Sequence, residues 1–295
     1  MTTARPAGEA APRHLASAPA ESRDQLHRKE AALYKALHDL PSILIAFSGG
    51  VDSTYLAWAA TRVLGTRALC VTAESASYPE SHRAMALGVA RDFRLNHEFV
   101  RTSEIERPEY RANPANRCYF CKQELYTHLS RIARERGIAA IADGSNADDR
   151  GDYRPGRQAA REFGVRSPLD DSDLTKDDIR ALSREAGLPT WDEPASACLS
   201  SRIPYFSEVT DEKLRMIERA EGVLKSLGFR VCRVRHHGTL ARIEFGRDEM
   251  ARALEPALSE RIDRELRGIG YQHVTIDLRG YRQGSLNDVL RLRPV

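Results

Sequence analysis

Apolar and polar positions follow two periods along the first part of the chain, one typical of short buried strands and the other of amphipathic helices. Each short apolar run ends in a few polar residues, called its polar tip below. A segment then follows in which apolar residues recur every three or four positions. The predicted strands cover residues 42–47, 68–75, 97–104 and 138–149. The predicted helices cover residues 24–40, 52–65, 81–93 and 122–137. This alternation predicts a mostly parallel sheet with helices on both faces.

A further helix is predicted over residues 174–189, with Thr175 at its N-cap. The following segment, WDEPASACLSSRIPY at 191–205, shows neither period. Beyond it the pattern returns as a helix, two strands, a helix and a closing strand and turn, over residues 207–228, 229–238, 240–246, 248–270 and 271–287. We therefore expect a parallel α/β domain over 28–190, a hinge over 191–205 and a smaller C-terminal α/β domain over 206–295.

The first 27 residues are rich in Ala, Pro and Ser, which predicts a disordered tail without chemistry. The 295-residue chain is 41% hydrophobic and 29% charged, as is ordinary for a soluble globular protein. It has neither an apolar run long enough to span a membrane nor the apolar core of a signal peptide. A net charge of +3 is too weak to indicate a nucleic-acid or membrane partner. We therefore expect a cytoplasmic protein.

The segment SGGVDS, at residues 48–53, lies where the first strand meets the following helix. Its glycines allow a tight turn that brings backbone N–H groups close to an anion, and the helix N-terminus adds partial positive charge. Ser48, Ser53 and Thr54 offer hydroxyl donors. The Walker sequence GxxxxGK[ST] does not occur, so the loop suits pyrophosphate binding better than γ-phosphate transfer. The alternative is a structural glycine turn capped by Asp or Ser.

Polar residues also follow the second and fourth strands, as TAESAS and DGSNADD. Ligands of parallel sheets bind at these strand ends, so the three carboxylates of DGSNADD suit Mg²⁺ beside phosphates. The same composition also fits a solvated turn. Gly144, in this tip, is assigned to the nucleotide site. Arg154 and Arg157 follow, and their guanidinium groups suit bidentate contacts to a substrate phosphate, although exposed loop arginines are common.

Five cysteines in an apparently cytosolic chain argue against a disulfide framework, because the number is odd. Cys70 and Cys232 lie in apolar strands and are expected to be packed core thiols. Cys118 and Cys121 form a CxxC at the start of a helix, where thiol pKa values fall, and Cys198 lies in the predicted hinge. These last three suit a [4Fe–4S] cluster with one open iron, persulfide and disulfide chemistry, or structural zinc.

In the second half, Arg233 and Arg235 alternate along one predicted strand and therefore point to the same face. Two guanidinium groups on one face suit a substrate phosphate or carboxylate. The alternative is a solvated strand face on which the arginines pair with Glu244.

SGGVDS after an apolar strand is similar, letter for letter, to the signature of the PP-loop ATP pyrophosphatase superfamily. The resemblance implies an adenine nucleotide alpha hydrolase-like parallel sheet domain. It also implies a reaction in which ATP adenylates a carbonyl or carboxylate, pyrophosphate leaves, and a nucleophile displaces AMP. On this resemblance Asp52 lies near Mg²⁺, and Ala46 and Ser75 lie near the adenosine. The residues that would hold the phosphates are Ser48, Gly49, Gly50, Asp52 and Ser53.

Further segments, in order from about residue 28 to 293, resemble the LarE family of ATP-dependent sulfur transferases in nickel-pincer nucleotide biosynthesis. They are NRCYFCK, DGSNADD, PASACLSSRIPY, CRVRHHGTLARIEF and DLRGYRQGSLN. The resemblance implies a homo-oligomer that adenylates a carboxylate of pyridinium-3,5-biscarboxylic acid mononucleotide and converts it to a thiocarboxylate. Some members sacrifice the sulfur of a cysteine matching Cys198, whereas others hold a [4Fe–4S] cluster on three cysteines. The CxxC makes this chain similar to the second group, with Cys118, Cys121 and Cys198 as ligands.

The same resemblance assigns roles in the second half of the chain. Asp52 and Cys198 would take part in the chemistry, with Ser201 and Arg202 beside the sulfur site. The residues matching substrate or acidic positions of the family are Arg233, Arg235, Glu221 and Glu244. The expected cofactors are ATP, Mg²⁺ and the cluster, and the expected partners are the nucleotide substrate and a sulfide source such as a cysteine desulfurase.

Four alternatives remain at the level of sequence. In the first, Cys198 donates its own sulfur. In the second, ammonia displaces AMP, as in an amidating synthetase, and the three thiols have no role. In the third, a tRNA accepts the sulfur, and in the fourth, the protein is an ATP-sensing or sulfur-carrier scaffold. The weak net charge counts against the tRNA. A scaffold would bind ATP without releasing pyrophosphate.

Overall fold

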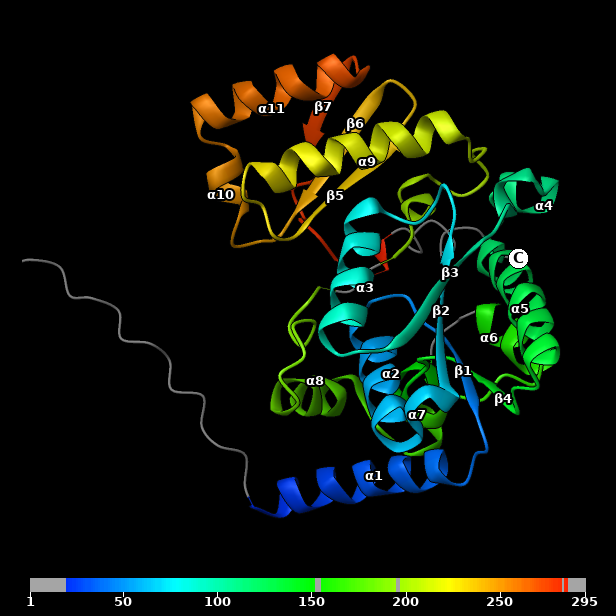
Figure 1. The fold of residues 1–295 in the computed structure, drawn as a ribbon. Helices are drawn as coiled ribbons and strands as arrows, with labels where there is room; N and C mark the ends of the chain where they lie inside the picture. The colour runs from blue at the N-terminus through cyan, green and yellow to red at the C-terminus, as the bar shows by residue number, and fades with distance from the viewer. Residues whose placement is uncertain (1–19, 152–154, 195–196, 283, 286–295) are drawn as a thin grey trace, which may run out of the picture.

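Two separate β-sheets organise the chain, as the computed structural model shows (Figure 1). The structure describes residues 20–151, 155–194, 197–282 and 284–285. Strands of the first sheet come from the first half of the chain, and those of the second sheet lie beyond residue 231. The division into domains at 190 and 206 remains a prediction, although the two sheets lie on either side of it.

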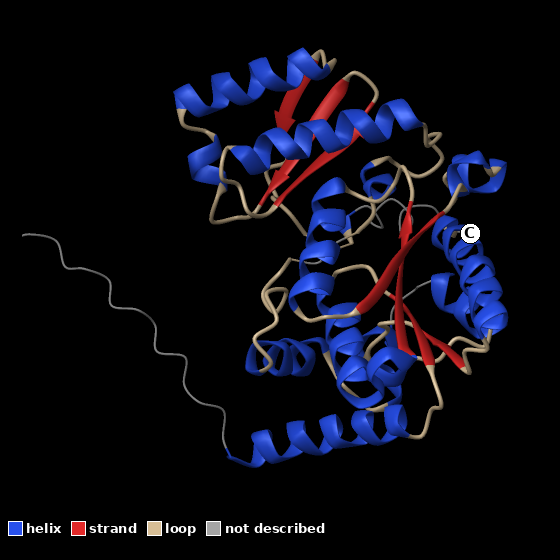
Figure 2. Cartoon of the chain, viewed as in Figure 1, coloured by secondary structure: helices blue, strands red, loops and turns tan. Residues whose placement is uncertain are grey.

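The first sheet has four parallel strands in the order β3-β2-β1-β4, which confirms the predicted α/β architecture (Figure 2). Its strands are β1 (Ile43–Ala46), β2 (Ala68–Glu74), β3 (Asn96–Arg101) and β4 (Ala140–Ala142). Parallel pairing aligns Ile43 with Ala68 and with Ala140. All four strands therefore end at one edge, where the predicted polar tips meet.

Helices cover both faces of this sheet because side chains alternate along each strand. Ile43 and Ile45 pack in one buried cluster with α1, α2, α3 and α8, whereas Leu44 packs on the other face against α5 and α6. The α-helices of this half are α1 (Ala20–His38), α2 (Val51–Leu64), α3 (Glu80–Asp92), α4 (Pro108–Arg111), α5 (Arg117–Arg136), α6 (Pro155–Glu162), α7 (Pro168–Asp171) and α8 (Lys176–Glu185). Short 3₁₀ turns are η1 (Gly65–Arg67), η2 (Glu104–Glu106) and η3 (Ala147–Gly151).

Helix α1 begins at Ala20, so the expected disordered tail over residues 1–27 is too long. The physical reason is the apolar stripe of the helix: Leu26, Leu33 and Leu37 are all buried in the first core cluster. Alanine and serine before Leu26 are compatible with a helix once that stripe has a core to pack on. The predicted disorder of residues 1–19 concerns a segment outside the described residues.

The second sheet is mixed: β5 (Cys232–His237) pairs antiparallel with β6 (Leu240–Phe245), which pairs parallel with β7 (His273–Ile276). Its helices are α9 (Asp211–Ser226), α10 (Met250–Ala253) and α11 (Pro256–Ile269). Cys232 and Val234 face the buried cluster formed with these helices. The alternate residues of β5, Arg233 and Arg235, therefore point to the opposite face.

The segment between the sheets is packed against both halves. It contains the 3₁₀ turn η4 (Leu199–Arg202), and Leu199 and Ile203 are buried with Tyr110 of α4 and with side chains of α9. The Leu199 N–H donates to the carbonyl of Ser77, 2.9 Å away. A hinge motion of this segment remains a prediction.

None of the helices in the described part of the chain is both long and apolar enough to cross a membrane.

Candidate active site

The SGGVDS loop forms a tight turn between β1 and α2, held by its own serines. The Ser53 hydroxyl accepts from the Ser48 N–H at 3.1 Å and contacts the Ser48 hydroxyl at 3.0 Å. Gly49 has a φ of +72°, a conformation that favours glycine, and a Cβ there would lie 3.0 Å from that of Ala86. The loop backbone is therefore fixed by sterics and hydrogen bonds before any ligand binds.

The N-terminus of α2 lacks the predicted alternative of a side-chain cap. Its N-cap residue is Gly50, and no side chain there accepts a helix N–H. The first N–H groups of a helix have no intrahelical partner and carry partial positive charge. This end of α2 can therefore bind an anion such as pyrophosphate.

Gly144 lies against this same helix end. A Cβ at Gly144 would approach the Ser53 nitrogen to 2.9 Å, closer than side chains pack in proteins. The DGSNADD tip after β4 therefore forms a wall of the nucleotide loop, and the wall requires glycine at this position.

A lysine from a distant part of the chain reaches the loop. The Lys176 ammonium group, at the start of α8, donates to Oδ2 of Asp52 at 2.5 Å. The other oxygen, Asp52 Oδ1, is buried and has no hydrogen-bond partner in the described part of the chain. The Lys176 N–H donates to Asp148 at 2.8 Å. Tertiary packing thus places beside the loop a positive charge that SGGVDS itself lacks. Lys176 was not among the residues predicted for the site from the sequence.

The three carboxylates of DGSNADD mostly support the loop itself. Asp143 accepts from the hydroxyls of Tyr126 and Ser167, and Asp149 accepts from the Asn146 N–H. Asp143 and Asp149 are buried, so the tip is not a solvated turn. Among the residues that the structure describes, no group of three His, Cys, Asp or Glu side chains is arranged to hold a metal ion.

Ala46 and Ser75 follow two adjacent strands of the sheet, as expected. Ser75 donates to the buried carboxylate of Glu104 at 2.7 Å. Tyr78, three residues on, donates to the Ser48 carbonyl at 3.0 Å and so joins this strand end to the phosphate loop. The two predicted adenosine contacts therefore border the SGGVDS loop.

Arg157 is engaged within the protein, because its guanidinium group donates to Asp170 at 2.6 Å. Helix α6, which carries it, starts beside the CxxC helix: a Cβ at Gly156 would lie 3.0 Å from the Lys122 side chain. Arg154 lies outside the described residues.

The three candidate thiols gather at the start of α5 and beside η4. Cys118 is exposed, and Cys121 and Cys198 are half-buried. Their charges interact, because ionisation of Cys198 raises the pKa of both other thiols. Cys70 and Cys232 are buried in the two cores, which confirms their prediction as packed thiols.

The expectation that the helix N-terminus lowers the thiol pKa values is wrong. Removal from water raises the pKa of Cys121 well above its usual value, and the Glu104 carboxylate adds to this effect. Although Cys118 reaches solvent, the surrounding protein atoms and Cys198 raise the pKa of its thiol as well. Burial and mutual repulsion outweigh the helix dipole, so both thiols are protonated at neutral pH in the absence of a ligand.

A buried arginine compensates for charge at this site. Arg117 donates to the carbonyl of Ser200 at 3.0 Å and also contacts Asn113. Tyr110 and Ser200 share a buried hydrogen bond of 2.6 Å. The sequence analysis overlooked Arg117, although its place beside the CxxC is visible in NRCYFCK.

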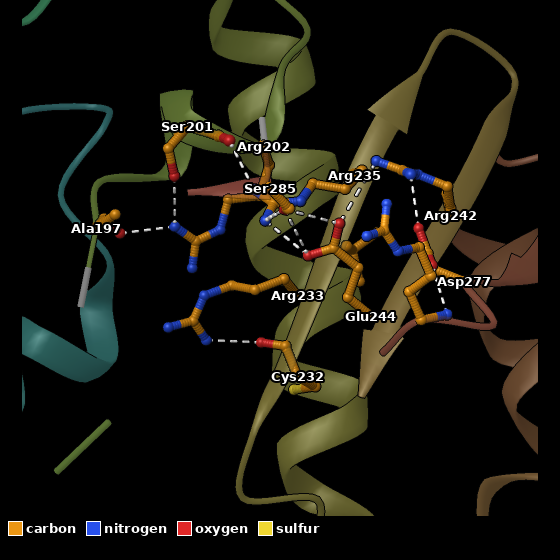
Figure 3. Close-up of polar contacts among 12 residues, drawn as sticks. Ala197, Ser201, Arg202, Cys232, Arg233, Arg235, Arg242, Glu244, Asp277 and Ser285 are labelled. Carbon is orange, nitrogen blue, oxygen red and sulfur yellow. Dashed lines mark hydrogen bonds and ion pairs between the residues drawn. The ribbon is translucent and has the colours of Figure 1, made fainter. Parts of the chain in front are cut away.

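Arg202 joins the thiol segment to the second sheet. Its guanidinium group makes a bidentate ion pair with Glu221 of α9, at 2.9 and 3.0 Å, and both residues are buried. It also donates to the Ala197 carbonyl and the Ser201 hydroxyl (Figure 3). A further contact goes to the Cys198 carbonyl at 3.0 Å. Burial raises the pKa of Glu221, but Arg202 and then Arg233 outweigh it, and the pKa lies below its usual value.

Arg233 and Arg235 lie on one face of β5, but their surroundings differ. Arg235 donates to Glu244 at 2.6 Å and to the Ser201 carbonyl at 2.8 Å. The predicted alternative, in which a β5 arginine pairs with Glu244, is therefore present, but the pair is buried and does not lie on a solvated face. Arg233 stacks over the Tyr281 ring, and burial together with Arg202 lowers its pKa. Figure 3 shows the guanidinium groups of Arg202 and Arg233 pointing the same way, toward the Ala197 segment.

The chain matches no protein-family model. Pyridinium-3,5-bisthiocarboxylic acid mononucleotide synthase of Lactiplantibacillus plantarum is 37% identical over 266 residues, which cover 90% of this chain and 96% of that protein. An uncharacterised protein of Synechocystis sp. is 43% identical over 265 residues, which cover 90% of this chain and 99% of that protein. One subunit of the glutamine-hydrolysing GMP synthase of Methanopyrus kandleri is 26% identical over 206 residues, 62% of each chain.

Proposed function

Because the chain belongs to the LarE family of ATP-dependent sulfur transferases, we propose that it converts carboxylates of pyridinium-3,5-biscarboxylic acid mononucleotide into thiocarboxylates. The observation that carries the proposal is the similarity to the Lactiplantibacillus plantarum synthase, which extends over nearly the whole of both chains. The product places the enzyme in nickel-pincer nucleotide biosynthesis.

The SGGVDS loop and Lys176 would bind ATP. The uncapped N-terminus of α2 would hold the β- and γ-phosphates, and Lys176 would move from Asp52 to the departing pyrophosphate. The unpartnered oxygen of Asp52 suits Mg²⁺, which accompanies the nucleotide. Adenylation joins a substrate carboxylate oxygen to the α-phosphorus, and pyrophosphate leaves with the bonding electron pair.

The anionic groups of the substrate would bind beside Arg202 and Arg233. Arg233 donates to the Cys232 carbonyl at 2.7 Å and stacks over the Tyr281 ring, and its guanidinium group points toward Ala197, so we assign it to the substrate anion (Figure 3). Arg235 makes its ion pair with Glu244. Glu221 and Glu244 would then hold the neighbouring arginines in place. Ser201, which contacts Arg202, would line the sulfur side of the same site.

Cys118, Cys121 and Cys198 would hold a [4Fe–4S] cluster. In the described residues the three thiols are not arranged as a set of metal ligands, so cluster binding would have to draw them together. The support for the proposal is that their charges interact and that Arg117 lies beside them, where it would offset negative charge; three thiolates would leave one iron open. When bound, the cluster would supply the sulfide that forms the new C–S bond as the C–O bond to AMP breaks. Cluster assembly must release protons, because both CxxC thiols are protonated beforehand. The alternative is a sacrificial Cys198.

Anaerobically reconstituted protein tests this assignment. We expect the native protein to convert the mononucleotide with ATP into AMP, pyrophosphate and thiocarboxylate over many turnovers when sulfide is supplied, as measured by mass spectrometry. Cys118→Ser should lose the cluster absorbance and fall to one turnover or none. The matched control is Cys70→Ala, which removes a thiol from the core, away from the site. Repeated turnover by Cys118→Ser would refute the cluster.

We further propose that the protein works in the cytoplasm as a homo-oligomer and receives sulfide from a donor such as a cysteine desulfurase. Pyrophosphate release distinguishes this enzyme from a scaffold that only binds ATP. Incorporation of sulfide rather than ammonia into the product distinguishes it from an amidating synthetase.

A further inference from the structure

The first turn of α3 is held between the two halves of the molecule. The Ser77 carbonyl, just before the helix, accepts from the Leu199 N–H of η4 at 2.9 Å. On the other side, Glu218 of α9 accepts from the Glu80 N–H at 2.7 Å, and Lys225 of α9 donates to the Ser81 hydroxyl at 3.0 Å. These contacts place residues 77–82 between the thiol segment and α9.

The face of α9 that meets this turn also carries Glu221, one of the predicted substrate residues. Glu218, Glu221 and Lys225 are spaced by three and four positions, so they lie on one face of the helix. Glu218 and Lys225 contact α3, and Glu221 between them holds Arg202. The side chain that α3 presents at this position, within reach of their charges, is His82.

The imidazole of His82 also connects to the nucleotide loop. Its ring packs edge-on against the Tyr78 ring, with centroids 6.0 Å apart, and the Tyr78 hydroxyl donates to the Ser48 carbonyl. His82 therefore lies at the junction of the ATP loop, the thiol segment and the arginine pair. No sequence motif singled it out.

We propose that His82 is an anion-binding residue of the substrate site, placed by the first turn of α3 to interact with an anionic group of the substrate that lies beside Arg202 and Arg233. The inference rests on the proposed function, because it takes the substrate to be a phosphorylated, carboxylated nucleotide. A protonated imidazole adds a charge-assisted hydrogen bond to that anion.

The charges around His82 make its protonation depend on the bound anion. Burial, followed by the nearby cations Lys225, Arg202 and Arg233, lowers the pKa of His82 to about 4. The charged and titratable groups that face it, or flank it on its own helix, are Lys225, Glu221 and Glu218 of α9, Arg202 of η4, Arg233 of β5, and Tyr78, Glu80 and Arg83. A bound phosphate or carboxylate offsets the cations, so the imidazole binds a proton more tightly in the complex.

The sign of the pH dependence follows from this difference. Since the His82 pKa is higher in the complex than in the free protein, binding takes up a proton at pH values between the two. Binding therefore strengthens through His82 as the pH falls toward the free value of about 4. The substrate phosphate protonates near pH 6 and opposes this trend in every variant, so the comparison with a His82 variant isolates the contribution.

Histidine Cε1–H signals of the native protein test the proposal directly, with His82→Gln used to assign the signal. With saturating pyridinium-3,5-biscarboxylic acid mononucleotide, we expect the His82 titration midpoint to rise by about two units, a hundredfold gain in proton affinity. His97 is the internal control, because it is also partly buried but hydrogen-bonds Thr72 instead of facing the arginines. Its midpoint should not move.

The outcomes separate the two claims. An unchanged His82 midpoint, when other signals report binding, overturns the inference and leaves the proposed function standing. If the mononucleotide shifts no signal, the proposed substrate is wrong, and a titration with inorganic phosphate then tests the anion site. A shift of the His82 signal by phosphate supports the site, and no shift overturns it.

As a second readout, His82→Gln should bind the mononucleotide within about twofold of the native protein at pH 8 and about tenfold more weakly near pH 5. Equal affinities at pH 5 contradict the proposal.

Discussion

At the scale of single residues, the nucleotide loop depends on positions that tolerate no side chain and on charges brought from elsewhere. A Cβ added at Gly49 would lie 3.0 Å from the Cβ of Ala86, and one added at Gly144 would lie 2.9 Å from the Ser53 nitrogen, closer than atoms pack in protein interiors. Lys176 contributes the positive charge beside Asp52. The fold thus places a lysine of another helix beside a loop whose own sequence has no Walker lysine.

Gly144→Ala should weaken both folding and ATP binding. The new Cβ lies 2.9 Å from the Ser53 nitrogen, so either the DGSNADD tip or the N-terminus of α2 must move. We expect a loss of about 1 to 3 kcal/mol in the free energy of unfolding and a weaker Kd for ATP, measured by denaturation and calorimetry. The control is Gly88→Ala, since no atom lies near its Cβ. Unchanged ATP affinity in Gly144→Ala would show that the tip does not shape the loop.

At the scale of elements, helix ends determine the chemistry of the site. Helix α2 leaves its N-terminus uncapped for a ligand, whereas α8 closes its own with a capping box between Thr175 and Asp178. The box fixes the first residue of α8, Lys176, whose side chain reaches Asp52. The N-terminus of α2 therefore keeps uncapped N–H groups of the kind that bind anions, whereas the capped N-terminus of α8 holds Lys176 beside Asp52.

Thr175→Ala should reduce ATP affinity through this positioning. Loss of the cap costs about 1 kcal/mol of stability and lets the first turn of α8 fray, so Lys176 is held less firmly. The matched control is Thr210→Ala, which removes the similar cap of α9 in the second half of the chain. Both variants should lower the Tm, but only Thr175→Ala should raise the KM for ATP. An equal effect on KM would contradict the role of α8.

At the scale of the whole molecule, buried charges connect the two halves across the thiol segment. The Arg202–Glu221 pair joins η4 to α9, and Arg235 joins β5 to the Ser201 carbonyl. A buried pair is costly to break, because either partner alone remains charged and desolvated. The same groups that we propose for the substrate site thus connect the two sheets.

Glu221→Gln should destabilise the folded protein by about 3 to 5 kcal/mol at neutral pH, because Arg202 stays buried without a carboxylate. Since the Glu221 pKa is lowered on folding, its contribution is present above the ordinary carboxyl pKa and is lost as the pH falls through the lowered value. The gap between native and variant stability, measured by urea unfolding, should therefore shrink below about pH 4. As a control, Asp263→Asn breaks the exposed pair with Arg267 and should cost less than about 0.5 kcal/mol. A similar loss in both variants would contradict this account.

Local patterns in the sequence were sufficient to predict the fold class, the strands, the longer helices, the SGGVDS turn and the Thr175 cap, because each depends on neighbouring residues and on periods of two or three to four. The short helices α4, α6 and α7 were not predicted, since segments of four to eight residues show too little of the helical period. The CxxC and the paired β5 arginines were also visible as spacings. The start of α1 was not, since it depends on the core that Leu26 packs against.

Only the tertiary structure decided which charges meet. Lys176 beside Asp52, Arg202 with Glu221, and His82 between α9 and η4 join positions far apart in the chain. It also reversed the expected thiol pKa shift, because burial and neighbouring charges are properties of the packed molecule and outweigh the local helix dipole. The sequence alone therefore determined the loop, the cap and the thiol spacing, whereas packing determined the electrostatics in which they act.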